Sequence, residues 1–238
     1  FTPQSMSNFP ENLPLEALPL GAPLPDWNGA TIPARAPIRG KFCVLEPLEM
    51  RHGAALWREI ADFPQLWHYL FDGPFARESE FCAWIQAQTE RDDALFFAII
   101  NRAGDVLGLC SFLRIDAANG SIEIGNLLFS PRLQRSREAT EAMFLAMKTA
   151  FDNGFRRYEW KCNALNAPSK NAALRLGFVY EGTFRSAAVV KGRNRDTSWF
   201  SIIESEWPAL KRAFESWLDE RNFDENGRQI QKLSALRR

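Results

Sequence analysis

The sequence predicts an α+β domain over residues 40–220, and three observations carry this prediction. First, strand and helix patterns follow one another in the order β, α, α, β, β, β, α, β, α, β, β, α, without an internal repeat. Second, three successive strands between residues 95 and 129 indicate an antiparallel meander. Third, the helix after them forces a crossover, so the next strand should run parallel to its partner.

A proline-rich arm, residues 1–39, is expected to precede this domain. Residues 1–40 hold eight of the fourteen prolines and show little hydrophobic period. Proline lacks a backbone N–H and fixes φ, so the arm can neither propagate a helix nor join a central strand. We expect it to lie extended on the surface, pinned by Trp27.

The domain is expected to begin with a strand and two helices. Residues 41–46 alternate weakly, which is typical of a strand, and residues 47–61 place Leu56 and Ile60 at helical spacing. A second helix is predicted over residues 77–91. Between the helices lies an aromatic segment that forms either one wall of a ligand pocket or a cap on the core: Trp67, His68, Tyr69 and Phe71.

The meander leads into a strand, a turn and a helix. Strands are expected at residues 95–101, 106–115 and 121–129, and after a Ser-Pro break a helix begins near Arg137. The first N–H groups of a helix have no intrahelical partner and carry partial positive charge, so this turn suits a pyrophosphate. Free amides and exposed arginines are also ordinary at any helix start, so both interpretations stay open.

The second half of the domain completes the pattern. Gly177 suits the end of a helix, and residues 221–238 form a polar tail that we expect to fray. The remaining elements are predicted as a strand at 155–163, a helix at 167–176, strands at 178–190 and 196–204, and a helix at 208–218.

Composition excludes several classes of protein. Positive and negative side chains balance at 29 each, which argues against binding nucleic acid through bulk charge. No run approaches the roughly 18 to 20 apolar residues that span a bilayer, and two histidines make a histidine-rich metal site unexpected. We expect a cytoplasmic protein without a metal and without nucleic-acid or membrane partners. Its dispersed cysteines should be buried small hydrophobes in a reducing compartment: Cys43, Cys82, Cys110 and Cys162.

Two motifs in this element order carry a resemblance to a known family. Gln134–Ala139 (QRSREA), followed by Thr140–Ala142, matches a pyrophosphate loop of Gln or Arg, two residues, Gly, one residue, then Gly or Ala. Asn166 and Ser169 stand ahead of Gly177 and Phe178 at the spacing of a second motif. On this basis the chain, over about residues 40–206, resembles the GNAT superfamily of acyl-CoA-dependent N-acetyltransferases. It is most similar to the RimJ/RimL-type branch, which includes enzymes that acetylate N-terminal amines of ribosomal proteins.

The resemblance implies how a cofactor would bind. The mixed, mainly antiparallel sheet should contain a parallel pair that splays at a bulge and admits the pantetheine arm of acetyl-CoA, while the helix start holds the pyrophosphate. Dimers are common among relatives, so a homodimer stays open. The residues so assigned are Leu127, Leu128, Phe129, Gln134, Arg135, Ser136, Arg137, Glu138, Ala139, Thr140 and Asn166.

Two residues are candidates for proton transfer. Glu123 precedes the splay, and alternation puts it on the face of Gly125 and Leu127, where it would serve as a base directly or through a water. Otherwise it is a solvated carboxylate or the partner of a buried arginine. Ser169 is the candidate acid for the leaving thiolate, and its alternative role is helix capping.

Two departures from the family pattern bear on activity. Arg137 replaces a glycine, so either this position needs no positive φ or the loop is reshaped, and the arginine either contacts phosphate or crowds the cofactor. Ala173 replaces the tyrosine that many members use as the acid.

The expected function is transfer of an acetyl group to a primary amine by direct attack in a ternary complex. The acceptor is open: a protein N-terminus, a small amine, an antibiotic or an amino acid. One alternative is a noncatalytic acyl-CoA sensor, which agrees with both departures. Another is transfer of an acyl group such as succinyl, which would require cationic side chains, with Arg185, Arg193 and Arg195 as candidates.

Overall fold

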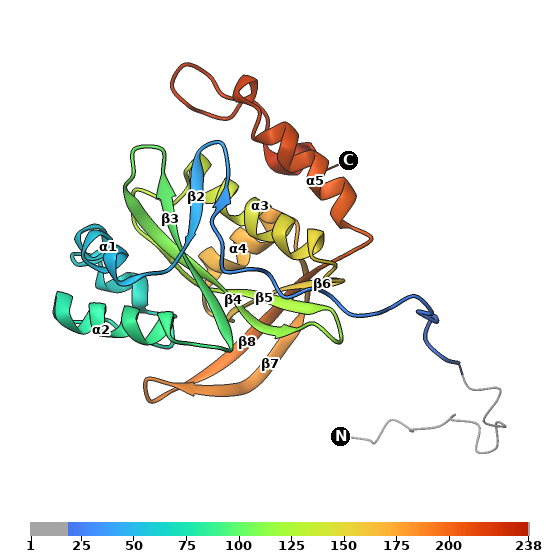
Figure 1. Cartoon of the computed structure of the whole chain (residues 1–238), viewed down its shortest axis with the longest axis horizontal. Coiled ribbons are helices and arrows are strands. Elements are labelled where there is room, and N and C mark those ends of the chain that lie inside the picture. The colour runs from blue at the N-terminus through green and yellow to red at the C-terminus, as the bar shows by residue number, and fades with distance from the viewer. Residues whose placement is uncertain (1–18, 238) are drawn as a thin grey trace, which may run out of the picture.

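The computed structural model describes residues 19–237, which form one mixed sheet flanked by helices (Figure 1). The strands are β1 (Ile38–Arg39), β2 (Cys43–Pro47), β3 (Ala94–Asn101), β4 (Val106–Asp116), β5 (Ser121–Phe129), β6 (Arg157–Asn163), β7 (Val179–Val190) and β8 (Arg193–Ile203). The helices are α1 (Gly53–Ile60), α2 (Glu78–Thr89), α3 (Arg137–Asp152), α4 (Ala167–Leu176) and α5 (Trp207–Trp217). The sheet order is β1-β2-β3-β4-β5-β6-β8-β7, and among the strands of residues 19–237 only β5 and β6 pair in parallel. The predicted mainly antiparallel sheet with one parallel pair is confirmed.

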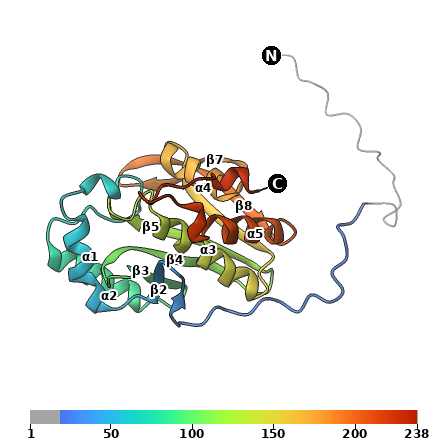
Figure 2. The same ribbon diagram turned by 90° about the horizontal axis from the view of Figure 1, so that it is seen from above.

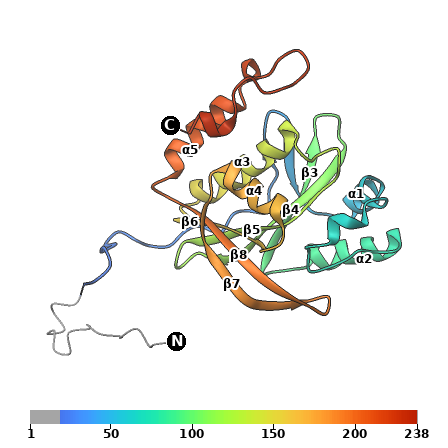
Figure 3. The ribbon, with the colours of Figure 1, turned by 180° about the vertical axis from the view of Figure 1, so that it is seen from behind.

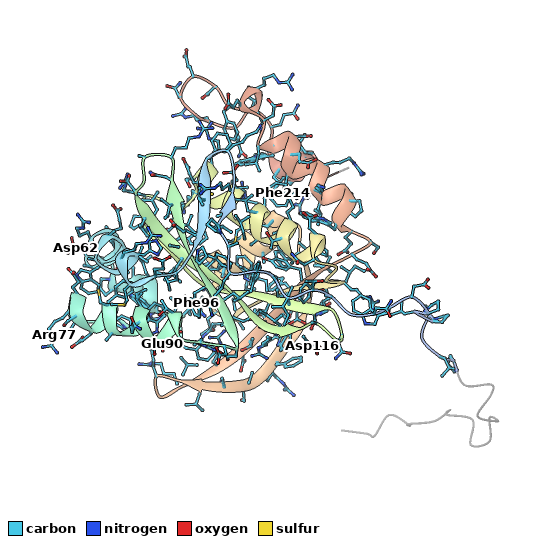
Figure 4. All side chains as sticks on the ribbon, in the orientation of Figure 1. Asp62, Arg77, Glu90, Phe96, Asp116 and Phe214 are labelled. Atoms are coloured by element: carbon cyan, nitrogen blue, oxygen red, sulfur yellow. The ribbon has the colours of Figure 1, made fainter. Side chains whose placement is uncertain are left out.

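Helices pack on both faces of this sheet (Figures 1 and 2). α3 and α4 lie on one face with α5 against α3, and α1 and α2 lie on the other face beside β3 and β4 (Figure 3). Ile122 and Ile124 belong to the buried cluster under α3, whereas Phe96 and Leu128 belong to the cluster under α1 and α2. Figure 4 shows Phe96 beside α2 and Phe214 on α5. Within residues 19–237, no helix is both long and apolar enough to cross a membrane.

The N-terminal arm is fastened to the domain by several hydrogen bonds, one of which comes from an aromatic side chain. Residues 1–18 lie outside the described residues, and the remainder of the arm crosses the turn between β4 and β5. Trp27 donates its indole N–H to the carbonyl oxygen of Ala118 at 2.8 Å, and the guanidinium of Arg156 lies 5.3 Å from its ring centre. The prediction that Trp27 pins the arm is confirmed.

The helix predicted for residues 47–61 has a different start. Pro47 still belongs to β2, and a 3-10 turn, Met50–His52, precedes α1. The backbone N–H of Glu49 donates to Nδ1 of His52 at 3.0 Å, and this closes the turn. His52 is buried and therefore serves the local fold rather than an exposed site.

The polar tail does not fray over the part that the structure describes. The side-chain amide of Asn222 donates to the carbonyl oxygens of Trp217, at 3.0 Å, and Gln231, at 3.2 Å. Leu233 is 1% exposed in the cluster that also contains residues of α4 and α5. The expectation of fraying is wrong, because composition does not show that a few apolar side chains anchor this segment.

The cysteines are free thiols and follow the prediction in part. Cys43, Cys110 and Cys162 are buried, whereas Cys82 is half-buried. Burial raises the pKa of Cys110 to about 12, so this thiol is protonated and unreactive at neutral pH. The buried three therefore act as small hydrophobic residues.

Candidate active site

The parallel strands β5 and β6 separate partway along their length. Their pairing covers Ser121–Ile124 and Arg157–Trp160 and then stops. Just beyond, the register of β5 against β4 shifts between Leu109 and Ser111, and Asn126 has a left-handed φ of 49°. A bulge bends its strand, so β5 turns away from β6. The splay implied by the resemblance is therefore present.

The three residues assigned to the pantetheine arm, Leu127, Leu128 and Phe129, all lie beyond the last β6 pair. Leu128 is buried under α1 and α2, whereas Leu127 packs toward α3. The prediction that Leu127 shares the face of Glu123 is therefore wrong, because the bulge shifts the alternation by one residue. Their role in binding stays a prediction.

The turn after β5 is held rigid by side-chain hydrogen bonds. Ser136 caps α3, and its Oγ accepts a hydrogen bond from the backbone N–H of Ala139 at 3.0 Å. The side-chain amide of Gln134 donates to the carbonyl oxygen of Phe129 at 3.0 Å. These two contacts fix the path from the end of β5 into the helix.

Four backbone N–H groups between Arg135 and Thr140 remain free. Within the described residues, the N–H groups of Arg135, Arg137, Glu138 and Thr140 donate no hydrogen bond. They lie at the positive end of a sixteen-residue helix, the position that favours an anion. The binding groups expected between Arg135 and Thr140 are thus reduced, since the N–H of Ala139 serves the cap.

Arg137 is held by aromatic rings. Its guanidinium carbon lies 4.3 Å from the ring centre of Phe42 and 4.7 Å from that of Phe223. The left-handed residue of the turn is Arg135, with φ of 60°, while Arg137 is the first residue of α3. The family's glycine is therefore not needed for a positive φ at this position.

The acidic residue of the Thr-Glu-Ala sequence anchors α3. Both carboxylate oxygens of Glu141 accept backbone N–H groups: Lys41 at 2.7 Å, Phe42 at 2.6 Å and Cys43 at 2.8 Å. A Cβ at Gly40 would lie 2.5 Å from this carboxylate, so a larger residue there would displace the carboxylate. Glu141 thus fastens α3 to the turn before β2.

The start of α4 carries the second motif. Oδ1 of Asn166 accepts the backbone N–H of Ser169 at 3.1 Å, so Asn166 is the helix cap. The hydroxyl of Ser169 accepts the indole N–H of Trp160 at 3.0 Å, and a hydrogen bond from Ser169 opposes the rise that burial causes in the pKa of Cys162. Capping by Ser169 is therefore wrong, and its role as an acid stays a prediction. Ala173 is completely buried and offers no proton donor.

Glu123 is buried and paired with two cations. Its Oε2 lies 2.9 Å from Nζ of Lys161 and 3.1 Å from Nε of Arg114. Lys161 also lies 2.6 Å from a carboxylate oxygen of Glu159 and 3.8 Å from the ring centre of Trp199. Burial raises the pKa of Glu123, while Lys161 and Arg114 oppose this shift. A solvated carboxylate is therefore excluded, and the role of base stays a prediction.

The aromatic segment divides between the two interpretations. Trp67 is 2% exposed and packs edge-on against Phe75 with ring centres 5.0 Å apart, so it belongs to the core. His68 packs edge-on against Tyr69, whose hydroxyl donates to the carbonyl oxygen of Leu165 at 3.3 Å, just before α4. Phe71 is exposed and faces Arg195 on β8. A pocket wall stays a prediction for the residues after Trp67.

The family described as acetyltransferase (GNAT) domain matches residues 43–179, more than half of the chain. This chain belongs to the GNAT acetyltransferase family. The match runs from β2 to the start of β7 and so includes the opening between β5 and β6 and both adjoining helix starts. The GNAT chain is an N-acetyltransferase, as its motifs predict.

Individual relatives agree with this assignment. A crystal structure of a GCN5-related N-acetyltransferase from Brucella melitensis has a TM-score of 0.88 and 46% identity, covering 90% of this chain and 99% of that one. Uncharacterized N-acetyltransferase p20 of Bacillus licheniformis is 28% identical over 172 residues, 68% of this chain and 93% of that protein. Ribosomal-protein-serine acetyltransferase of Escherichia coli (strain K12) is 29% identical over 118 residues, 49% of this chain and 65% of that protein. The last match supports the RimJ/RimL-type branch for this GNAT chain.

The GNAT fold brings the predicted residues to two places. The loop and cap residues gather where β5 and β6 part, since each strand leads directly into its helix. Glu123 lies in the paired part of β5, opposite Glu159 in the register. Sequence reasoning missed Lys161 and Arg114, because their place beside Glu123 depends on strand register. The alternation of Glu159 and Lys161 along β6 puts both side chains on one face of the strand. With the register of β5 and β6 known, it would have identified Lys161 as a partner of Glu123.

Proposed function

We propose that this GNAT enzyme transfers an acetyl group from acetyl-CoA to a primary amine by direct attack in a ternary complex. The observation that carries the proposal is the opening between β5 and β6 next to a helix start with four N–H groups that donate no hydrogen bond within the described residues. Donors fixed in this way suit a diphosphate, and the opening gives the pantetheine arm a route into the sheet. We also propose that the enzyme works in the cytoplasm, as the sequence predicts.

Two side chains have the chemistry for proton transfer. The amine nitrogen attacks the thioester carbon, the carbon–sulfur bond breaks, and one proton must leave the amine while one reaches the thiolate. Glu123 would accept the amine proton, directly or through water, since Lys161 and Arg114 favour its ionised form. Ser169 would donate its hydroxyl proton to the thiolate.

The acceptor is an amine, and a protein N-terminus is one candidate. The Escherichia coli relative is named for acetylating a ribosomal-protein serine, but it matches about half of this chain. The alternative of a noncatalytic sensor was based on the two departures, Arg137 and Ala173. Arg137 no longer supports it, because its guanidinium packs on aromatic rings and leaves the helix start open. Alignment alone contributes roughly 7 kcal/mol or more in such reactions, so the absent tyrosine need not abolish turnover.

The base is tested by replacing Glu123 with Gln. We expect kcat to fall by about a hundredfold or more, while the acetyl-CoA Kd, measured by calorimetry, changes by less than about threefold. Glu159→Gln is the matched control, because Glu159 bonds the same lysine without being the proposed base. Its kcat should stay within about tenfold of the parent enzyme.

The pH dependence gives a second measurement on the same variants. A base must be ionised, so kcat should rise with pH through the pKa of Glu123, which burial raises above the ordinary value of 4.5. Glu123→Gln should lose this acidic limb. A variant that keeps the parental kcat and pH profile would exclude Glu123 as the base.

A further inference from the structure

The sheet face opposite α3 carries a chain of paired charges. It crosses β4, β5, β6 and β7, and each of its cations has a carboxylate within 3.1 Å. The chain contains Arg114, Glu123, Lys161, Glu159, Arg157 and Glu181. These cations are therefore already neutralised by the protein itself.

Arg195 on β8 is the exception on this face. It is 7% exposed, and no carboxylate within the described residues lies within 4.0 Å of its guanidinium. Its Nε donates to Oγ of Thr197 at 3.3 Å and one terminal nitrogen donates to the carbonyl oxygen of Tyr69 at 3.4 Å, both long hydrogen bonds. A guanidinium has five N–H donors, so most of its capacity is unused.

A buried cation without a counterion is costly to keep. Burial lowers the pKa of Arg195, and the charge of Glu123 is among those that oppose this shift. The ring of Phe71, centred 4.3 Å from the guanidinium carbon, offers a cation–π contact but no negative charge. An apolar side chain would fill this position at lower cost, which points to a ligand that supplies the missing anion.

The position of Arg195 relates it to the proposed base. Along β8, Arg195, Thr197 and Trp199 alternate onto the face that carries Lys161 and Glu123. Thr197 lies opposite Asn163, the last residue of β6, where the strands have parted. Arg195 therefore stands beside the open end of the splay, on the side of Glu123.

The neighbouring strand β7 has a shallow, solvent-exposed surface. It runs along Phe184, Arg185, Ser186 and Ala187. Phe184 packs on Trp199 with ring centres 4.7 Å apart, so it lies on the same face of the sheet. The next residue of β7, Ala188, pairs with Arg195. The part of β7 next to Arg195 is therefore exposed to solvent.

We propose that Arg195 binds a carboxylate of the acceptor, which makes the acceptor a small molecule of the amino-acid class with its amine and its anion in one molecule. This inference rests on the proposed acetyl transfer. The amine is then placed toward Glu123 and the carboxylate toward Arg195. Arg185 is a lesser candidate because it is exposed, and Arg193 is exposed at the hairpin tip.

The test compares amino acids with their carboxamides, which keep the amine but lose the negative charge. Thiol release from acetyl-CoA is measured for the parent enzyme, Arg195→Met and Arg195→Lys. We expect Arg195→Met to lower kcat/KM at least about tenfold for the acids and less than about threefold for the amides. Arg195→Lys should retain part of the preference, since it keeps the charge but not the planar fork. Ratios are compared between variants because the carboxamide changes the basicity of the amine.

Three results would overturn the inference. Equal losses on acids and amides would make Arg195 a clamp for the segment around Phe71. An Arg195-dependent preference for succinyl-CoA with neutral amines would place the anion on the acyl group. If no amine releases thiol, the proposed function fails by itself, and calorimetric titration of the amino acids into protein saturated with coenzyme A then decides. Binding that Arg195→Met abolishes supports the inference, and binding that it leaves unchanged overturns it.

Discussion

The two helices that follow the parting strands begin in different ways. At α3, the Ser136 cap satisfies the N–H of Ala139, whereas the N–H groups of Arg135, Arg137, Glu138 and Thr140 donate no hydrogen bond within the described residues. At α4, the N–H of the first residue already donates to the carbonyl oxygen of Leu165, at 2.9 Å.

The remaining groups of α4 are satisfied in turn. Pro168 has no N–H, the N–H of Ser169 reaches the Asn166 side chain, and that of Lys170 reaches the Asn166 carbonyl oxygen. The same strand-to-helix connection therefore yields one end with donors for an anion and one that is closed. A helix start becomes a candidate anion site only when its cap leaves donors over.

The largest expected effect tests what holds the open end in place. Glu141→Gln should lower the free energy of unfolding by about 3 kcal/mol, because an amide cannot accept three N–H groups and brings its own N–H toward them. Urea denaturation measures this loss. Glu138→Gln, a half-buried carboxylate on the same turn, is the control and should change stability by less than about 0.5 kcal/mol.

A second variant disrupts the contact of Glu141 by changing the turn before β2 instead of the carboxylate. Gly40→Ala places a methyl group 2.5 Å from the Glu141 carboxylate and should destabilise the protein as well. Parental stability in both variants would show that α3 needs no external anchor.

The next effect removes a single donor from the open end. Glu138→Pro deletes one free N–H at the second position of α3, where proline is tolerated. The protein already has proline at the second position of α4 and of α5, as Pro168 and Pro208. We expect the acetyl-CoA Kd, measured by calorimetry, to rise about tenfold or more, as for loss of a charge-assisted hydrogen bond.

The control for this variant keeps the donor and removes the side chain. Glu138→Ala should bind acetyl-CoA within about twofold of the parent protein. A thermal melt first checks that Glu138→Pro is folded. If the folded variant binds acetyl-CoA with parental affinity, the free amides of α3 do not hold the pyrophosphate.

The fold was readable from the sequence because its elements are local patterns. The helical spacing near Leu56 and the three successive strands between residues 95 and 129 predicted elements that the structure contains. The split start of α1 and the packing of Leu233 were not predicted. Both depend on tertiary contacts, which a local pattern does not encode.

The site was readable only in part. The loop and cap motifs led to the opening between β5 and β6, but one bulge at Asn126 was enough to move Leu127 to the other face. The partners of Glu123 and Arg195 come from other strands, so they depend on register and topology. The sequence also did not show which N–H groups are free, because the Ser136 side chain accepts the N–H of Ala139.

A smaller effect compares the two caps directly. Ser136→Ala and Asn166→Ala should each lower the free energy of unfolding by about 1 kcal/mol, since each removes one side-chain acceptor from a helix start. Urea denaturation of both variants checks this equality. Calorimetry then shows whether α4 also takes part in cofactor binding. A change above about threefold in the acetyl-CoA Kd for Asn166→Ala would show that α4 contacts the cofactor, as the resemblance implies.

The smallest effect concerns Arg137, the departure from the family's glycine. Its guanidinium lies between the rings of Phe42 and Phe223, so Arg137→Met should lower the free energy of unfolding by less than about 1 kcal/mol. The acetyl-CoA Kd should stay within about threefold, because the free N–H groups remain. Phe223→Leu removes one ring without touching the turn, and the double variant should lose less than the two single losses combined. A tenfold weaker Kd in Arg137→Met alone would instead make this arginine a phosphate ligand, and the open end of α3 would then depend on side chains as well as on its backbone.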